Sequence, residues 1–232
     1  MYIGRVKAAG PERTRKLANE LSETRVSSNH EIAPGIFMLS FPREFDFIPG
    51  QSVWLTVDIS IPPRLYSIAS GSGDPRVEIL YDLVPEGLLT PRLAGLRQGH
   101  TLLVSSAFGP FRDEVGPSCW VAAGTGVAPF ASMVRSGLVQ EKTLIHGSRT
   151  IAGLLQRTLF ADVLGERYTA CCTREAAAGV FHGRPTEWLT LQRLPLGSRY
   201  LLCGGSRMVV DCRDIIIAKG VPFENVIGEI YF

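Results

Sequence analysis

The first half of the chain is built from short runs in which apolar and polar residues alternate. Glycine and proline turns separate these runs, which predict β-strands near residues 25–32, 36–41, 52–58, 64–69, 76–82 and 101–104. Short strands at regular spacing are typical of a closed antiparallel barrel. We therefore expect a six-stranded antiparallel β-barrel domain over residues 23–115, preceded by an N-terminal arm over residues 1–22.

From Ser118 onward the pattern changes to continuous apolar strands separated by helices. Strands are predicted at 119–123, 143–146, 168–172, 200–202 and 226–231, and helices at 124–130, 153–164, 185–191 and 207–219. This alternation indicates a parallel sheet covered on both faces. We expect a five-stranded α/β domain over residues 116–232, and such sheets bind nucleotides at the carboxyl ends of their strands.

Composition narrows the class of protein. A chain of 232 residues with 45% hydrophobic and 20% charged residues suits two globular domains with real cores. The net charge of +2 does not favour a nucleic-acid partner. No apolar run has membrane-spanning length, and the first residues lack the apolar core of a signal peptide. We therefore expect a cytoplasmic protein that binds neither membrane nor nucleic acid.

The cysteines and histidines argue against a metal centre. Five cysteines without a Cys-x-x-Cys pair favour free thiols and give no support for an iron–sulfur cluster. The four histidines are scattered along the chain. We expect no metal site.

The stretch 64–70 carries the first candidate chemistry. On a strand, Arg64 and Tyr66 point to one face and Ser67 to the other. A guanidinium binds phosphate oxygens in a bidentate manner, and a phenol ring offers an apolar wall with a polar tip. The pair would suit a flat ring with a phosphate tail. An ordinary half-buried strand with an exposed arginine would show the same residues.

A second candidate lies between residues 86 and 96. Thr90 followed by Pro91 predicts an N-cap and a helix start. Gly87 allows backbone to approach a ligand closely, and free amides at a helix start bind anions. The segment Gly87, Leu88, Leu89 and Thr90 is therefore a candidate phosphate site, although a capped helix that only closes one end of the barrel fits as well.

Two further candidates lie in the α/β half. The turn Gly124-Thr125-Gly126 joins a strand to a helix, where phosphate can reach the backbone. Arg149, Arg174 and Arg184 each follow a strand or precede a helix. Three arginines at one sheet edge suit a 2′-phosphate with its two charges, whereas arginines on loops are often only solvated. Of the three, Arg149 leaves the two interpretations most evenly balanced.

These motifs resemble the plant-type ferredoxin–NADP⁺ reductase family, especially its bacterial ferredoxin/flavodoxin members. The matching stretches are Arg64–Ser70, Gly109–Phe111, Gly124–Phe130, Cys172–Glu175 with Gly183-Arg184, Cys203–Gly205 and the tail Gly228–Phe232. They occur in the family's order and the resemblance covers about residues 25–232. Pro129 departs from the usual dinucleotide fingerprint, which has a glycine there.

The resemblance implies roles for each motif. Arg64, with Leu65, Tyr66 and Ser67, would hold FAD, with Arg64 at the pyrophosphate and Ser67 near flavin N5. The segment 87–90 would also contact the FAD pyrophosphate. The turn 124–126 would hold the pyrophosphate and nicotinamide of NADP(H), and Arg174 and Arg184, with Arg149 as a looser match, its 2′-phosphate.

The resemblance also implies a chemical centre. Cys203 would lie against the nicotinamide, Glu229 would be a proton or hydrogen-bond partner of Ser67, and Tyr231 would stack over the flavin. Phe232 would be an additional cover, over the adenine. Cys203 could instead be a small buried apolar residue, and the terminal Tyr-Phe pair could simply plug the core.

The resemblance therefore predicts an FAD enzyme that exchanges hydride with NADP(H) and single electrons with a ferredoxin or flavodoxin. One alternative is a reductase component that supplies an oxygenase. Another is a non-catalytic flavin- or nucleotide-binding electron-carrier subunit. The oligomeric state stays open, with a monomer slightly favoured.

Overall fold

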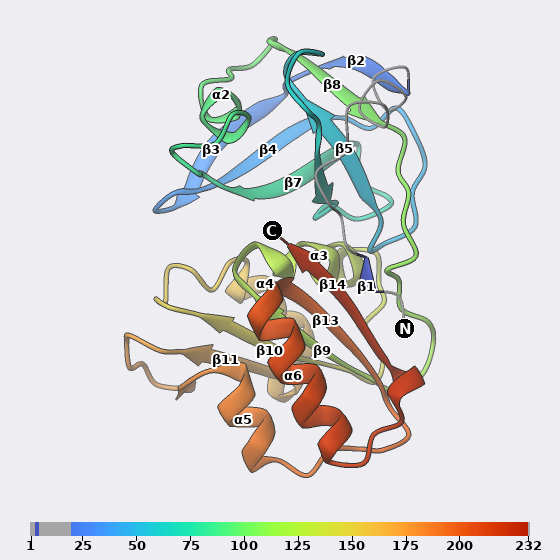
Figure 1. Ribbon diagram of the computed structural model, residues 1–232, viewed down its shortest axis with the longest axis vertical. Coiled ribbons are helices and arrows are strands. Elements are labelled where there is room, and N and C mark those ends of the chain that lie inside the picture. Colours follow the sequence, from blue (N-terminus) through green and yellow to red (C-terminus); the bar gives the residue numbers. More distant parts are fainter. Residues whose placement is uncertain (1–2, 5–19, 232) are drawn as a thin grey trace.

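The computed structural model describes residues 3–4 and 20–231. Figure 1 shows two layers of different architecture: antiparallel strands in the upper part and a parallel sheet with its helices below. The prediction of an antiparallel half followed by a helix-covered parallel half is confirmed.

The antiparallel half contains two sheets. One has the order β2 (Leu21–Arg25), β8 (Thr101–Ser105), β5 (Ser52–Thr56) and β6 (Arg64–Ser67); the other has the order β3 (Ser28–Ala33), β4 (Ile36–Pro42) and β7 (Arg76–Asp82). A bridge between Ile68 and Ile79 connects them just beyond β6. Alternate residues of both sheets, Val53, Ile68 and Ile79 among them, are fully buried in one shared core.

The predicted count of six strands is one too low, because the segment 25–32, expected to be one strand, contains the end of β2 and most of β3. Val26 donates its backbone N–H to His100 O, whereas Ser27 donates to Ser40 O. The chain therefore leaves the first sheet and joins the second between these two residues. The alternation of apolar and polar residues does not reveal where the chain changes sheets, because a similar side-chain pattern continues on both sides of that point.

The parallel sheet has the order β1-β14-β13-β9-β10-β11-β12. Its strands are β1 (Ile3–Gly4), β9 (Ser118–Ala123), β10 (Lys142–Ser148), β11 (Tyr168–Cys172), β12 (Val180–His182), β13 (Arg199–Gly205) and β14 (Val226–Tyr231). The five predicted strands are present, and two short edge strands are added. β12 has only three residues, too few for a periodic signal, and β1 belongs to the segment expected to be an arm.

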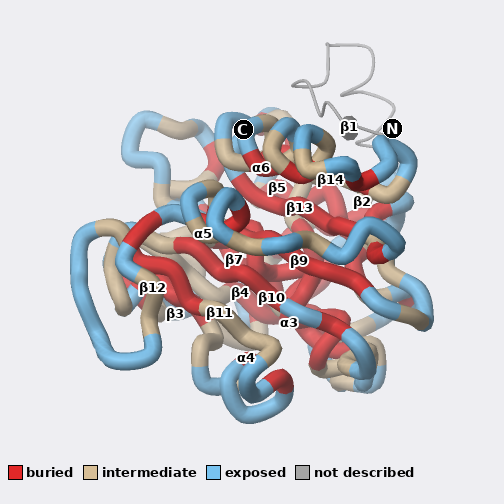
Figure 2. The backbone as a smooth tube through the Cα atoms, turned by 90° about the horizontal axis from the view of Figure 1, so that it is seen from below, coloured by how far each residue is buried: buried red, intermediate tan, exposed pale blue. Residues whose placement is uncertain are grey.

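Helices cover both faces of this sheet, as predicted. They are α3 (Ala128–Arg135), α4 (Arg157–Leu164), α5 (Pro185–Leu191) and α6 (Ser206–Ala218). The helix α2 (Thr90–Ala94) lies in the antiparallel half. Three 3₁₀ turns are also present: η1 (Gly124–Val127), η2 (Gly165–Arg167) and η3 (Phe223–Asn225). Strand β9 shows the alternation: Trp120 packs with α3 and α4, and Val121 packs with α5 and α6. The strands at the centre of the sheet are therefore almost entirely buried (Figure 2).

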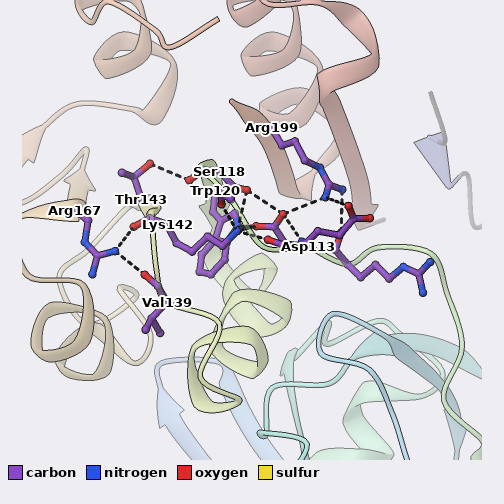
Figure 3. A network of polar contacts seen from close by, with 11 residues as sticks. Asp113, Ser118, Trp120, Val139, Lys142, Thr143, Arg167 and Arg199 are labelled. Carbon is purple, nitrogen blue, oxygen red and sulfur yellow. Dashed lines mark hydrogen bonds and ion pairs between the residues drawn. The ribbon is translucent and has the colours of Figure 1, made fainter. Parts of the chain in front are cut away.

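A buried ion pair lies at the amino edge of the parallel sheet (Figure 3). Lys142 Nζ lies 3.0 Å from Asp113 Oδ2, and both side chains are fully buried. Trp120 Nε1 and Ser118 Oγ also donate to the Asp113 carboxylate, at 2.7 and 3.0 Å. Arg199 adds a second cation at 3.5 Å. The network fixes the segment that follows the antiparallel half onto the starts of β9, β10 and β13.

Within the described residues, no helix has the length and apolar character needed to cross a membrane.

Candidate functional site

The candidate chemical centre forms where the two halves meet. Ser67, the last residue of β6, donates its hydroxyl to Glu229 Oε1 of β14 at 2.6 Å. The Ser52 hydroxyl lies 3.1 Å from that of Ser67. Cys203 of β13 pairs in register with Glu229. Residues separated by 162 positions are therefore in direct contact, and the sequence-predicted group 67, 203 and 229 lies together.

Burial controls the protonation states at this centre. It raises the pKa of Glu229 from its ordinary value of 4.5 to about 7, although the hydrogen bond from Ser67 favours the charged form. Burial, and next the nearby Glu229 charge, raise the pKa of the Cys203 thiol well above its ordinary value. Cys203 is therefore a neutral thiol and not a nucleophilic thiolate.

The raised pKa of Glu229 predicts a pH-dependent stability. Between about pH 4.5 and 7 the native state holds a proton that the unfolded state releases, so the free energy of unfolding falls as pH rises through this window. The total loss is on the order of 3 kcal/mol, since one pKa unit corresponds to about 1.4 kcal/mol. The Glu229→Gln variant should lack this loss.

The measurement is Tm of the FAD-loaded protein at pH 5 and pH 8. Relative to Glu229→Gln, the wild type should lose stability at the higher pH. Glu224→Gln, which changes an exposed glutamate just before the same strand, serves as the control and should follow the wild type. Parallel curves for wild type and Glu229→Gln would contradict the raised pKa.

Tyr231 covers this centre from the end of β14. Its hydroxyl is buried near the Cys203 thiol and the Ser67 hydroxyl, and burial raises its pKa well above the ordinary value. Within the described part of the chain, that hydroxyl has no hydrogen-bond partner of normal geometry. A buried phenol without a partner is uncommon. The lack of a partner is consistent with a tyrosine side chain that exchanges places with a ligand. Phe232, the predicted adenine cover, lies outside the described residues.

The side chains of the strand β6 differ in exposure. Arg64 is exposed, Leu65 and Tyr66 are half-buried, and Ser67 is buried. The Tyr66 ring packs edge-on against Tyr81, with ring centres 6.3 Å apart. Among the residues described, Arg64 forms no ion pair. Its guanidinium therefore remains available to an anion beside an aromatic surface.

The segment before α2 differs from the prediction. Thr90 is not the N-cap: Leu89 occupies that position, and Thr90 is the first helical residue. The Thr90 hydroxyl instead accepts from Val84 N at 3.0 Å and lies 3.2 Å from Val84 O. It closes the preceding loop, which competes with capping for the same oxygen. Leu89 is buried and Leu88 is 64% exposed.

Gly87 packs closely within the same loop. A Cβ there would lie 3.0 Å from Val84 O and 3.3 Å from Thr90 Oγ1. The glycine therefore permits close packing within the loop, a role that is independent of any ligand.

The turn 124–126 lies against the candidate centre. Gly124 has φ +57°, and a Cβ on Gly126 would lie 2.4 Å from Cys203 O. The glycines therefore let this turn contact the end of β13 directly. Thr125 Oγ1 donates to Asp82 Oδ2 at 2.7 Å. Asp82 carries no sequence motif, so sequence reasoning missed it.

The three arginines follow neighbouring strands at the carboxyl edge of the sheet. Arg149 follows β10, Arg174 follows β11 and Arg184 follows β12. Arg174 N donates to Arg149 O at 3.0 Å, and Gly183 N donates to Cys172 O at 2.9 Å, so the loops are adjacent. All three arginines are exposed, and none of them pairs with an acidic side chain of the described residues.

The described residues hold no group of three or more His, Cys, Asp or Glu side chains that could bind a metal ion. All five cysteines are free and buried.

Comparison with known proteins places the chain in a family. No family model matches the sequence. Ferredoxin–NADP reductase A of Sorangium cellulosum is 32% identical over 239 residues, covering 88% of this chain and 85% of that protein. The toluate 1,2-dioxygenase electron transfer component of Pseudomonas putida is 29% identical over 90% of this chain and 66% of that protein.

A solved structure shares the fold over nearly its whole length. The ferredoxin NADP⁺ reductase from Neisseria gonorrhoeae with bound FAD and NADP has a TM-score of 0.81, with 22% identity, and the match covers 92% of this chain and 99% of that one. The shared fold agrees with the sequence similarity to the Sorangium enzyme. The chain belongs to the ferredoxin–NADP reductase family.

Proposed function

We propose that this protein is an FAD-dependent oxidoreductase that passes hydride between NADP(H) and FAD, and single electrons between FAD and a ferredoxin or flavodoxin. The observation that carries the proposal is the 2.6 Å contact between Ser67 and Glu229. It joins the strand expected to bind flavin to the sheet expected to bind nucleotide. Membership of the reductase family supports it.

In this proposal the antiparallel half, residues 23–115, holds FAD. Arg64 binds the pyrophosphate, Tyr66 and Leu65 line the flavin, and the segment 87–90 contributes backbone contacts. Arg64 is exposed beside the half-buried Tyr66 and forms no ion pair with the described residues, which supports these roles. These residues would hold FAD, which would supply the chemistry that links two-electron hydride transfer to one-electron transfer.

The parallel half, residues 116–232, holds NADP(H). The turn 124–126 binds the pyrophosphate and orients the nicotinamide toward Cys203, and Arg174 and Arg184, with Arg149 beside them, bind the 2′-phosphate. The absence of a side chain at Gly126 and the adjacent loops of the arginines support this assignment.

The residues at the centre orient the reacting groups and exclude water. The Ser67 hydroxyl is held by Glu229, which has a pKa of about 7 and can therefore hold or release a proton near neutral pH. The neutral Cys203 thiol lines the nicotinamide position without adding charge. Tyr231 covers the centre and moves aside for the nicotinamide. We also place the protein in the cytoplasm, where its five free thiols would stay reduced.

Removing the Tyr231 ring should tighten NADP⁺ binding. Ring stacking contributes on the order of 0.5–1.5 kcal/mol, so the Tyr231→Ser variant should bind NADP⁺ about 2- to 12-fold more tightly. Turnover should fall in the same variant because the product leaves more slowly. The measurement is a titration of NADP⁺ against the flavin absorbance.

Tyr231→Phe is the matched control. It keeps the ring and removes a hydroxyl that makes no hydrogen bond within the described residues, so it should behave like the wild type. Deleting Phe232 alone should change NADP⁺ affinity less than Tyr231→Ser. If Tyr231→Ser leaves both the flavin spectrum and the affinity unchanged, the tail is only a structural plug.

The direct test of function is spectroscopic. The purified protein should be yellow, NADPH should bleach it, and it should then reduce cytochrome c through ferredoxins or flavodoxins of its source organism. Lack of bleaching would contradict the proposal and favour a non-catalytic flavin- or nucleotide-binding carrier subunit.

A second function is favoured by the similarity to the toluate dioxygenase component. In that case the protein would supply electrons to an oxygenase. Faster reduction of a purified oxygenase component than of ferredoxins or flavodoxins would identify this role.

A further inference from the structure

The strand β7 contacts both ends of the segment η1–α3. At the beginning of that segment, the Thr125 hydroxyl donates to Asp82 Oδ2 at 2.7 Å. Asp82 is the last residue of β7, and Thr125 lies in the turn assigned to the nicotinamide. The carboxylate of one half of the protein therefore holds the turn of the other half.

At the end of the segment, Arg135 binds two carboxylates. Its Nη2 lies 2.7 Å from Asp74 Oδ2, and its Nη1 donates to Glu78 of β7. The three side chains are only 23–33% exposed, so water weakens these ion pairs less than it would at the open surface.

The loop before β7 packs on the same helix end. Ser72 N donates to Ser136 Oγ at 2.9 Å. A Cβ on Gly71 would lie 2.9 Å from Arg135 O, so only a glycine fits there without a shift. The end of α3 is therefore held by backbone packing as well as by charge.

Between the two ends, β7 faces α3 with an apolar side chain. Residues 78, 80 and 82 share one face of the strand because side chains alternate. Leu80 is 3% exposed and belongs to the same buried cluster as Val127 and Phe130. Residues 78–82 span about 13 Å of strand and residues 125–135 about 15 Å of helix, so the two elements match in length. Figure 1 shows α3 at the junction, below the antiparallel strands.

The opposite face of β7 packs toward β6, the strand expected to bind flavin. Ile79 forms the bridge to Ile68, next to Ser67, and Tyr81 packs against the Tyr66 ring. Both are buried in the core of the antiparallel half. The strand β7 therefore contacts β6 and the residue after it through its odd-numbered residues. It contacts the segment η1–α3 through its even-numbered residues.

We propose that β7 sets the position of the turn 124–127 relative to the strand β6, and that Asp82 and Arg135 are positioning residues of the reaction. The proposal rests on the proposed function. Asp82 acts through Thr125, and Arg135 acts through the end of α3. Both act before any ligand binds, since their contacts are within the chain.

Asp82→Ala and Arg135→Gln test the proposal. Each variant should bind FAD within about twofold of the wild type, because neither residue belongs to the FAD site. Turnover should fall at least about tenfold, since displacing a reacting group by about 1 Å costs up to 100-fold. The charge-transfer absorbance of the protein saturated with NADP⁺ should weaken. Hydrogen exchange of amides 124–127 should accelerate before NADP⁺ is added.

Conservative and remote variants provide the controls. Asp82→Asn keeps an acceptor oxygen for Thr125 and should restore most of the charge-transfer band. Arg43→Gln removes an ion pair with Asp46 inside the antiparallel half, from an arginine side chain with similar exposure, 27% against 25%. It should change stability slightly and leave the charge-transfer band unchanged.

Two outcomes would overturn the inference. One is an unchanged charge-transfer band and turnover in Asp82→Ala and Arg135→Gln, with only a lower Tm. The other is an equal loss of the band in Arg43→Gln. Failure of the proposed function is separate, because then NADPH would not bleach the wild type itself.

Discussion

Replacing both Arg174 and Arg184 by alanine should raise KM for NADPH on the order of 100-fold and leave KM for NADH nearly unchanged. Only NADPH carries a 2′-phosphate. Hydrogen bonds to charged groups contribute about 1.5–3 kcal/mol each, and two bidentate donors would act on the same group. Both side chains are exposed, so the lower part of that range applies.

The measurement is steady-state kinetics with each nucleotide. Arg207→Ala, which removes an arginine that is 85% exposed on α6, is the control for the loss of surface charge. It should change neither constant. Arg149→Ala alone should show whether this third arginine, adjacent to Arg174, contributes. Equal increases of KM for NADPH and NADH in the double variant would contradict the assignment of the 2′-phosphate site.

Arg64→Ala should weaken FAD binding roughly 10- to 100-fold. In the proposed site the change would remove a bidentate, charge-assisted contact to the pyrophosphate, worth about 1.5–3 kcal/mol. Because Arg64 is exposed and forms no ion pair with the described residues, its loss should leave Tm of the apoprotein almost unchanged. The effect should therefore appear in cofactor affinity and not in folding.

The measurement is quenching of FAD fluorescence by added apoprotein. Arg76→Ala, an exposed arginine at the beginning of β7, is the matched control and should bind FAD like the wild type. Full flavin content and unchanged FAD affinity in Arg64→Ala would mean that the FAD site has been placed wrongly.

Local signals were sufficient for much of the fold. Turn residues and alternation predicted the strand β6 itself, because both signals depend on neighbours in sequence. Continuous apolar stretches predicted β9 and its covered faces. The corner at Val26–Ser27 was missed because it is defined by backbone partners, His100 and Ser40, that lie far apart in sequence.

The candidate site was predictable only where a motif carried it. Ser67, Cys203 and Glu229 were found through the resemblance and lie together in the structure. Thr90 was misassigned because two hydrogen-bonding roles compete for one hydroxyl, and only tertiary structure decides between them. Asp82 gave no signal, since a single aspartate at the end of a strand resembles any surface residue until Thr125 is placed beside it.

The buried pair of Asp113 and Lys142 determines how the protein can be divided. A fragment that begins at residue 116 would contain Lys142 without the carboxylate of Asp113 and without the Glu114 carbonyl that also accepts from its ammonium group. Leaving one member of a buried pair unpaired costs about 3–5 kcal/mol. A fragment of the parallel half therefore keeps this buried pair only when the cut is made before Asp113, ahead of the change in sequence pattern at Ser118.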